Sequence, residues 1–512
     1  MLFNSYYFLI YFLPIVLLCY YGAHAAGNKA SEDKAYMWHK AALWVLIVAS
    51  FIFYAYDNVY YLTLLAGSIL INWFIALIMN GRIKSGKPAD GTNLSGDHVC
   101  DTLQKLILAA GIIIDIGVIF YFKYYDFFIE NMNALFKADF NLRHIVLPLG
   151  ISFFTFQQIS YLVDTYRGET TDYSFTEYAA FVSFFPQLVA GPIVLHSELI
   201  PQYRDRSRWK ISADRIAEGL YVLAMGMFKK VIIADKFGQA VTWAWIDTAS
   251  RSSVDMLLAS LFYTFQLYFD FSGYCDMAIG IAKLFSLDLP VNFNSPYKAV
   301  SINDFWKRWH MTLTRFLTNY IYIPLGGNRK GRVRTYINIL IVFLVSGIWH
   351  GANWTFILWG VLHGILQVLN RMCKKIWDKV PKAIAWFVTF FIVNMLWIIF
   401  YAPSVSEGLS VWVKICSFSD MHISSDIFLL FIMKEVNMIL AMLGPVGALA
   451  TTYYQWYMIM YLILSFVICL CCKNLHEERF RPTVGKAVLS ALLLIWAVVS
   501  FSGVSTFLYF NF

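Results

Sequence analysis

Residues 301–332 read SINDFWKRWHMTLTRFLTNYIYIPLGGNRKGR, and residues 346–364 read SGIWHGANWTFILWGVLHG. The first segment is basic and aromatic and carries His310, whereas the second is almost uncharged and carries His350. A histidine from a cationic, water-facing surface and a histidine from membrane depth are therefore brought into one local region. The hydropathy of most of the remaining sequence indicates membrane-embedded structure that surrounds this pair.

The composition is that of a membrane protein. Of 512 residues, 59% are hydrophobic and only 14% are charged. A soluble protein of this length would form several domains with far more surface charge. The net charge of +8 lies in loops between apolar runs, which suits anionic lipid headgroups better than nucleic acid. We therefore expect a chain that contacts membrane lipids and has no nucleic-acid partner.

Long apolar runs predict the membrane-spanning helices, because a helix needs about 20 apolar residues to cross the hydrocarbon core. The runs are continuous rather than alternating, which favours helices over a barrel. They cover residues 2–21, 41–56, 59–79, 106–122, 145–163, 178–195, 216–233, 257–284, 336–349, 354–369, 384–401, 427–443, 457–472 and 488–510. The run at 257–284 is expected to break at Gly273. These runs predict an all-α polytopic protein with one domain over residues 1–512, about 11 crossings and some re-entrant or half helices.

Basic residues predict the orientation, because they are enriched in cytoplasmic loops. They flank the first and third loops, whereas the turn at Asp57-Asn58 has none, which places the N-terminus outside. The basic loops at 204–210 and 307–334 are then cytoplasmic. The basic loop at 374–382 fits either two crossings over 336–369 with a turn at 351–353, or one crossing plus a re-entrant segment with a different count upstream.

His350 is the strongest candidate for a catalytic residue. An ionisable group at membrane depth is costly and usually faces a cavity or a pathway. Glycines on either side allow close approach, and imidazole can take a proton from a hydroxyl near neutral pH, as acyl transfer to an alcohol requires. A packed histidine bonded to a backbone carbonyl is an equally good interpretation. Asn353 could share the face of His350 if the helix continues and orient the ring or donate to an oxyanion, or it could cap a helix.

The basic aromatic segment offers a second histidine and a candidate donor site. His310 could be a second polar group in a reaction chamber, or part of a basic mouth for a phosphate-bearing donor such as an acyl thioester of coenzyme A. An amphipathic helix at the membrane interface is the alternative. The candidate donor-binding residues are Trp306, Arg308, Arg329 and Lys330. Arg329 and Lys330 follow two glycines and could hold phosphates, or they could form a plain turn with cytoplasmic charge.

Two acids and one helix break lie in apolar surroundings. Asp270 and Asp276 are expected to form ion pairs that hold helices together, or to orient a histidine. Residues 185–192, FPQLVAGP, interrupt a helix, which is tolerated at membrane depth where the backbone is buried or lines a cavity. His363 is expected to be a packed histidine. The sequence has no G-x-S-x-G, H-E-x-x-H or carboxylate-rich cluster, which argues against a serine hydrolase or zinc protease and predicts no metal.

Four motifs resemble the membrane-bound O-acyltransferase superfamily: FNSPY at 293–297, DFWKRWH at 304–310, YIPLGGNR at 322–329 and WHGANW at 349–354. They are similar to the bacterial alginate O-acetyltransferase branch, which is related to the D-alanyl-lipoteichoic-acid and peptidoglycan O-acetyltransferase membrane subunits. The similarity covers nearly the whole chain, with its core motifs at about 145–370.

The resemblance implies a fold and an activity. Helices would surround a central funnel that opens to the cytoplasm, with His350 as the catalytic histidine at the narrow end and His310 as the second, more peripheral one. The implied donor is acetyl-CoA or another acyl carrier thioester, used as a substrate, with no bound cofactor. The implied acceptor is a hydroxyl of an exported polysaccharide, reached through an extracytoplasmic acyltransferase partner, and the implied location is the bacterial cytoplasmic (inner) membrane.

The aromatic tail at residues 507–512 adds a possible receiver. It resembles the C-terminal hexapeptide of this branch, whose tyrosine, Tyr509 here, is proposed to take the acyl group. An aromatic belt at the membrane edge is the alternative.

Two other functions remain open from the sequence. A transporter or channel could move an acyl carrier or lipid without chemistry, with Asp270, Asp276 and the break at 186–192 along its path. A membrane scaffold for a glycan synthase would need the histidines only for packing.

Overall fold

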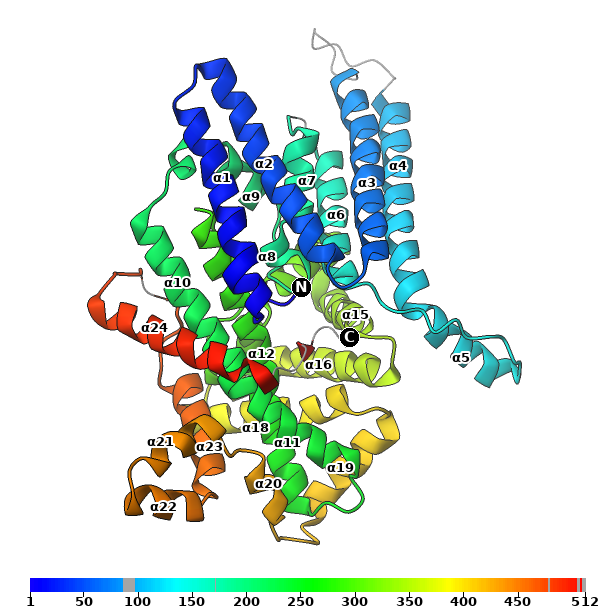
Figure 1. Cartoon of the computed structure of the whole chain (residues 1–512). Coiled ribbons are helices and arrows are strands. Elements are labelled where there is room, and N and C mark those ends of the chain that lie inside the picture. The colour runs from blue at the N-terminus through cyan, green and yellow to red at the C-terminus, as the bar shows by residue number, and fades with distance from the viewer. Residues whose placement is uncertain (86–96, 171, 478, 504–506, 509–512) are drawn as a thin grey trace.

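The computed structural model describes the chain except residues 86–96, 171, 478, 504–506 and 509–512 (Figure 1). Every regular element among the described residues is a helix. Within the described part of the chain, six helical segments are long and apolar enough to cross a membrane: Tyr7–Asn28, Lys34–Ala55, Val59–Gly81, Thr102–Phe136, Gly331–His350 and Lys382–Tyr401. The predicted all-helical membrane fold is confirmed, and the count of about 11 crossings stays a prediction.

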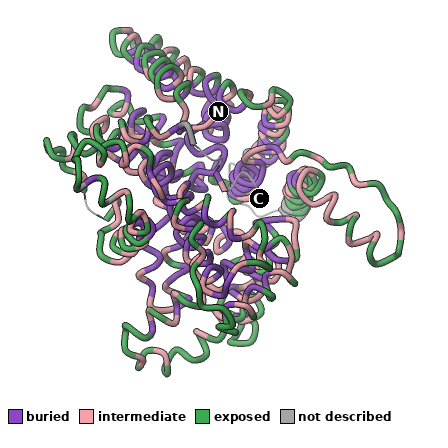
Figure 2. The backbone as a smooth tube through the Cα atoms, turned by 60° about the horizontal axis from the view of Figure 1, so that its bottom comes forward, coloured by how far each residue is buried: buried purple, intermediate pink, exposed green. Residues whose placement is uncertain are grey.

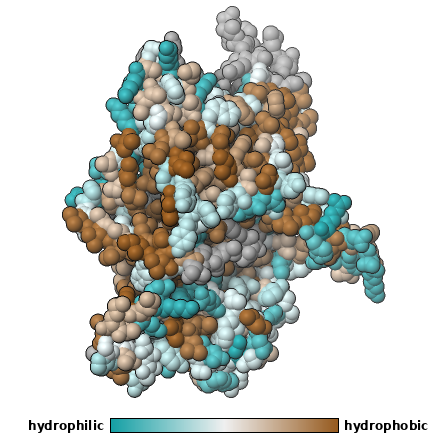
Figure 3. Space-filling view, viewed as in Figure 1, coloured by the Kyte–Doolittle hydropathy of each residue, from teal (hydrophilic) through white to brown (hydrophobic). Residues whose placement is uncertain are grey.

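Long helices pack side by side in the N-terminal part (Figure 1). They are η1 (Tyr7–Phe12), α1 (Leu13–Asn28), α2 (Glu32–Ala55), α3 (Val59–Ser85) and α4 (Asp97–Ile119). Hydrophobic residues cover much of the face seen over these helices, as expected for a surface in lipid (Figure 3). A π-helix, η2 (Phe120–Tyr124), leads from α4 into α5 (Tyr125–Phe136), which extends away from the body of the molecule.

Helix α12 (Ser253–Leu284) lies at the centre of the fold and is buried along most of its length. It packs against α10 (Ala213–Met227), η4 (Phe228–Ala234) and α11 (Asp235–Ile246), and buried backbone gathers in this middle region (Figure 2). The predicted break at Gly273 is wrong. The helix continues through the glycine, whose missing side chain admits a neighbouring backbone: a Cβ there would lie 2.9 Å from the Gly226 carbonyl oxygen.

Shorter helices connect the remaining parts. Before α10 come α6 (Ile151–Tyr166), α7 (Phe175–Ser183), α8 (Phe185–Leu188), α9 (His196–Arg204) and η3 (Arg206–Trp209). After α12 come η5 (Pro296–Lys298), α13 (Ile302–Trp306), α14 (Met311–Leu317), η6 (Thr318–Tyr322), α15 (Gly331–His350), α16 (Trp354–Met372) and α17 (Lys374–Trp377). The chain then forms α18 (Lys382–Tyr401), α19 (Val405–Ser417), α20 (Ser425–Leu429), α21 (Lys434–Ala441), α22 (Pro445–Thr452), α23 (Trp456–Leu470), α24 (Val484–Val499) and η7 (Ser500–Gly503).

Several predicted runs are not single helices. Within 145–163 the helix begins only at Ile151, and within 488–510 α24 ends at Val499. Within 178–195, α7 ends at Ser183 and only the four-residue α8 follows before α9. Within 427–443, α20 and α21 are separate short helices. Apolar composition alone does not distinguish a continuous span from buried, interrupted backbone.

The interrupted backbone at 185–192 is buried, as its sequence predicted. The Phe185 amide donates to the Ser50 hydroxyl at 3.0 Å, and the Ile193 amide donates to the Thr312 hydroxyl at 3.0 Å. Side chains thus satisfy backbone groups that a helix would otherwise pair. Val189 also lines the cavity that contains His350.

The two buried acids form ion pairs, which confirms their predicted structural role. Asp276 contacts Lys229 at 2.5 Å, and Asp270 contacts Lys230 at 2.6 Å. Both pairs join η4 to α12, which places charged partners between two helices that are buried along most of their length.

Candidate active site

His350 is the last residue of α15. The chain turns at residues 351–353, and α16 begins at Trp354. A turn at 351–353 belongs to one of the two topologies considered for residues 336–369, and the number of crossings there stays a prediction. Because the helix does not continue past His350, Asn353 does not share its helical face.

Close packing of α15 on α16 fixes this helix end. A Cβ on Gly360 would lie 2.5 Å from the Phe343 carbonyl oxygen, and one on Gly347 would lie 2.5 Å from that of Phe356. Both neighbours are backbone atoms, which cannot move away as a flexible side chain can. The glycines therefore hold the two helices, and with them His350, at a fixed separation.

Gly360→Ala should lower the melting temperature, because the added methyl group forces α15 and α16 apart at a cost of about 1–3 kcal/mol. Gly67→Ala is the matched control: Gly67 is also helical, and a Cβ there meets no atom within 4 Å. That substitution should be neutral or stabilising, because alanine is the better helix former by about 1 kcal/mol. Thermal unfolding of both purified variants checks this, and equal melting temperatures would contradict the close packing.

Lys123 closes the C-terminal end of α15. Its ammonium donates to the carbonyl oxygens of Trp349 at 2.7 Å and His350 at 3.1 Å. Beside it, the Tyr124 hydroxyl donates to the Ile348 carbonyl at 2.6 Å. The last carbonyls of a helix have no partner within the helix and carry its negative dipole end, so a cation there is stabilising. Lys123 was not among the predicted site residues, although its place directly after the apolar run at 106–122 was a visible signal.

Aromatic rings surround His350. Ring centroids of Trp349, Trp359 and Phe400 lie 4.9, 5.1 and 5.2 Å from that of His350. The indole N–H groups of Trp349 and Trp359 are buried and have no hydrogen-bond partner in the described part of the chain. Two potential donors therefore lie in the shell around the imidazole.

A small cavity opens beside His350. Its volume is about 20 Å³, enough for a water-sized group, and it is lined by Lys123, Trp349, His350, Val189 and residues 147–153. Gly150 adopts a φ of +73°, and a Cβ there would lie 2.5 Å from the Leu188 carbonyl oxygen. The cavity thus brings a candidate base and a cationic group together.

His310 is completely buried within the protein. The residue has a φ of +44° at the start of α14, and its Nδ1 lies 3.1 Å from Oδ1 of Asn292. Its ring centroid is 6.0 Å from that of Trp349, which also contacts His350. The structure therefore brings both predicted histidines into contact with the same tryptophan.

Asn292 orients His310, and the sequence analysis missed it. Besides His310, its Oδ1 accepts hydrogen bonds from the amide and the hydroxyl of Thr312, at 3.2 and 2.9 Å. The Met311 amide donates to the Asn292 carbonyl at 2.9 Å. Asn292 lies in an irregular segment, directly before the FNSPY motif at 293–297, and no periodic pattern marks it in the sequence.

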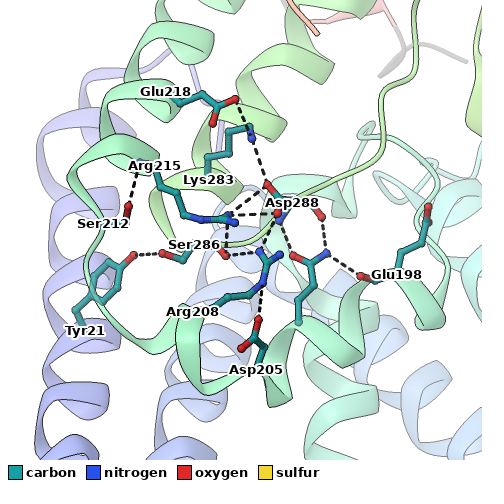
Figure 4. Close-up of polar contacts among 11 residues, drawn as sticks. Tyr21, Glu198, Asp205, Arg208, Ser212, Arg215, Glu218, Lys283, Ser286 and Asp288 are labelled. Atoms are coloured by element: carbon teal, nitrogen blue, oxygen red, sulfur yellow. Dashed lines mark hydrogen bonds and ion pairs between the residues drawn. The ribbon is translucent and has the colours of Figure 1, made fainter. Parts of the chain in front are cut away.

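Asp288 fixes the segment that carries Asn292 (Figure 4). Its carboxylate contacts Arg208 at 2.8 Å, Arg215 at 3.3 Å and Lys283 at 3.2 Å. Burial would raise the pKa of Asp288, but hydrogen bonding to Arg208 and the charges of Lys283, Arg215 and Arg208 outweigh it and lower the pKa to about 2.

Asp288→Asn should lower the melting temperature at neutral pH, because three cations lose their shared carboxylate. A depressed carboxyl pKa stabilises the fold above the unfolded value of about 3.9, and this stabilisation is lost as the pH falls through the folded value. The difference between wild type and variant should therefore shrink between about pH 4 and pH 2. Melting curves over this range check the prediction, and a constant difference would contradict it.

The predicted donor-binding residues lie in different places. The Trp306 indole donates to Nδ1 of His363 at 3.2 Å, which confirms His363 as a packed histidine, and Arg308 pairs with Asp304 at 2.8 Å. Arg329 and Lys330 are exposed just before α15. They stand at the opposite end of this 20-residue helix from His350, about 30 Å away.

Of the two remaining predicted residues, the structure describes Asn353 but not Tyr509. Asn353 caps α16: its Oδ1 accepts from the Thr355 amide at 3.0 Å, and its Nδ2 donates to the Pro403 carbonyl at 2.9 Å. A catalytic role for Asn353 stays a prediction. Tyr509 lies outside the described residues.

The fold and this site define a multi-pass helical membrane protein built around buried histidines. Residues 165–412 match the model of the membrane-bound O-acyltransferase family. The match contains both histidines and most of the helices that hold them.

Similarity to curated relatives extends further. The chain is 39% identical to a peptidoglycan O-acetyltransferase of Helicobacter pylori, over 100% of this chain and 98% of that protein. It is 37% identical to a probable alginate O-acetylase of Pseudomonas putida, over 83% and 82% of the two chains. A teichoic acid D-alanyltransferase of Streptococcus thermophilus is 27% identical over 49% of this chain and 68% of its own. The chain belongs to the membrane-bound O-acyltransferase family, and it is a membrane acyltransferase.

Proposed function

We propose that this protein moves an acetyl group from a cytoplasmic acyl thioester, acetyl-CoA, to an exported glycan. The observation that carries the proposal is the cavity that Lys123 and His350 share at the end of α15. Similarity over the whole length to a peptidoglycan O-acetyltransferase makes a cell-wall glycan the first acceptor to test.

His350 acts as the general base in this proposal. It takes the proton of an acceptor hydroxyl, and the oxygen then attacks the thioester carbonyl. The carbonyl oxygen becomes an oxyanion, the carbon–sulfur bond breaks, and the thiolate leaves and is protonated. Lys123 has three N–H donors and uses two on backbone carbonyls, which leaves a third for the oxyanion.

The two ends of α15 have different roles in this proposal. Arg329 and Lys330 precede the helix and are placed on the cytoplasmic side by the charge pattern, where they attract the phosphates of the donor. His350 stands about 30 Å away at the other end, a distance close to the thickness of the hydrocarbon core. In this arrangement about 11 crossings surround a funnel in the bacterial inner membrane, with the N-terminus outside.

The acceptor side needs further components. Tyr509 in the aromatic tail is the proposed first receiver of the acetyl group. An extracytoplasmic acyltransferase partner then transfers it to the glycan. His310, held by Asn292 and in contact with Trp349, helps to orient the groups of the site.

Release of coenzyme A from acetyl-CoA by the purified protein in nanodiscs tests the proposal. We expect steady thiol release that requires the protein and increases when the acceptor partner is added. Uptake of intact acetyl-CoA or lipid into vesicles, with no cleavage of the thioester, would instead support a transporter and refute the proposal.

A further inference from the structure

A buried cluster of charged side chains surrounds Asp270 of α12 and contains more than one ion pair. Lys230 contacts Asp270 at 2.6 Å and Asp235 at 2.8 Å, and none of the three side chains is more than 6% exposed. The second oxygen of Asp270, Oδ2, accepts a hydrogen bond from the Leu508 backbone amide at 3.0 Å. A residue more than 200 positions away in the sequence thus contacts the cluster through its main chain.

Phe507 adds two contacts of other kinds. Its ring is buried, with the Lys230 ammonium 4.6 Å from the ring centroid. Tyr274, one helical turn beyond Asp270, packs edge-on against the same ring at 4.9 Å. A charge-assisted hydrogen bond, a cation–π contact and an aromatic pair therefore converge on two consecutive residues.

The neighbouring ion pair shows what a purely structural cluster looks like here. Asp276 uses one oxygen for Lys229 at 2.5 Å and the other for His476 at 3.0 Å. Both clusters join a lysine of η4 to an aspartate of α12, and the second oxygen of Asp270 accepts from the Leu508 amide where that of Asp276 faces His476.

The position of the cluster relates it to the histidines. Phe271, the residue after Asp270, packs against His310 with ring centroids 4.8 Å apart. Cys275 on the same helix contacts Asn292, the residue that orients His310. The contact with Leu508 is therefore made beside the wall of the histidine site.

We propose that Asp270 and Lys230 form an anchor that holds residues 507–508 beside the histidine site. These two residues are positioning residues, because they act through the tail and not on the substrate. The anchor itself is independent of the proposed acetyl transfer, and only its consequence for catalysis rests on that function.

Hydrogen–deuterium exchange with residue-level mass spectrometry tests the anchor in the full-length protein in nanodiscs. The Leu508 amide should exchange at least about tenfold faster in Asp270→Leu than in wild type, because its charged acceptor is gone. Asp276→Leu is the matched control and should leave this amide slow. Equal exchange in the two variants, or fast exchange in wild type, would overturn the anchor.

Phe507→Ala keeps the test decisive if Asp270→Leu fails to fold, because it removes the ring from the tail side and leaves the ion pair intact. It too should speed exchange at Leu508, and unchanged exchange would overturn the anchor. Acetyl transfer to an external acceptor should fall about tenfold in the same variant. If the Leu508 amide exchanges fast in Phe507→Ala while acetyl transfer stays at the wild-type rate, the positioning role is refuted. A wild-type protein that protects Leu508 but never cleaves acetyl-CoA would refute the proposed function and leave the anchor standing.

Discussion

Replacing His350 by glutamine should lower acetylation of the exported glycan by about 10²–10⁴-fold, the contribution typical of a general base. Glutamine keeps a polar group of similar size within the ring of Trp349, Trp359 and Phe400 but cannot accept the proton. His350 also ends α15, where its backbone carbonyl is held by Lys123 whatever the side chain. The variant should therefore insert and fold, and the loss should appear in the rate and not in the amount of protein.

His363→Gln is the matched control for this experiment. His363 is as deeply buried, and its ring centroid lies 4.7 Å from that of Trp359, but it is bonded to Trp306 and does not line the cavity. Its replacement should keep most of the activity. Glycan acetylation measured in cells that express equal amounts of each variant gives the comparison. Full acetylation with the His350 variant would remove the proposed base.

Replacing Lys123 by methionine should reduce the rate of acetyl transfer by about 10²–10³-fold. The variant loses the proposed oxyanion donor. In addition, two buried carbonyls at the end of α15 lose their hydrogen-bond partner, which lowers the free energy of unfolding by about 1–3 kcal/mol for each carbonyl. Methionine fills a similar volume, so the effect reports charge and hydrogen bonding more than packing. The turnover of purified protein and its melting temperature together separate the two losses.

Tyr124→Phe separates helix capping from catalysis. It removes a single hydrogen bond to the Ile348 carbonyl, next to those of Lys123, and Tyr124 does not line the small cavity. We expect a modest loss of stability, about 0.5–1.5 kcal/mol, with nearly normal turnover. If Lys123→Met lost no more activity than Tyr124→Phe, Lys123 would be only a helix cap.

Local patterns were sufficient for much of the fold. Continuous apolar runs predicted helices such as α3 and α18, and glycines around His350 indicated close approach, which α15 and α16 show. Asp270 and Asp276 were expected to pair because a charge in apolar surroundings needs a partner, and both do.

Long-range packing determined what the sequence could not show. Asn292 has no periodic pattern around it, and its role arises because an irregular segment passes beside α14. His310 stands among basic residues that suggest a wet surface, yet its left-handed backbone turns the side chain into the core. Gly273 suggested a broken helix, whereas a second helix packs against it. Each outcome depends on a neighbour distant in sequence.

Transfer across a sealed membrane tests the central claim most directly. Proteoliposomes with the donor sites facing inward would contain acetyl-CoA labelled in the acetyl group and in the nucleotide with different isotopes, with the acceptor partner and a glycan fragment outside. We predict that the acetyl label reaches the outer glycan while the nucleotide label stays inside, and that His350→Gln blocks the transfer. Both labels appearing outside together, or acetyl transfer that persists without His350, would contradict an acyl relay through this histidine.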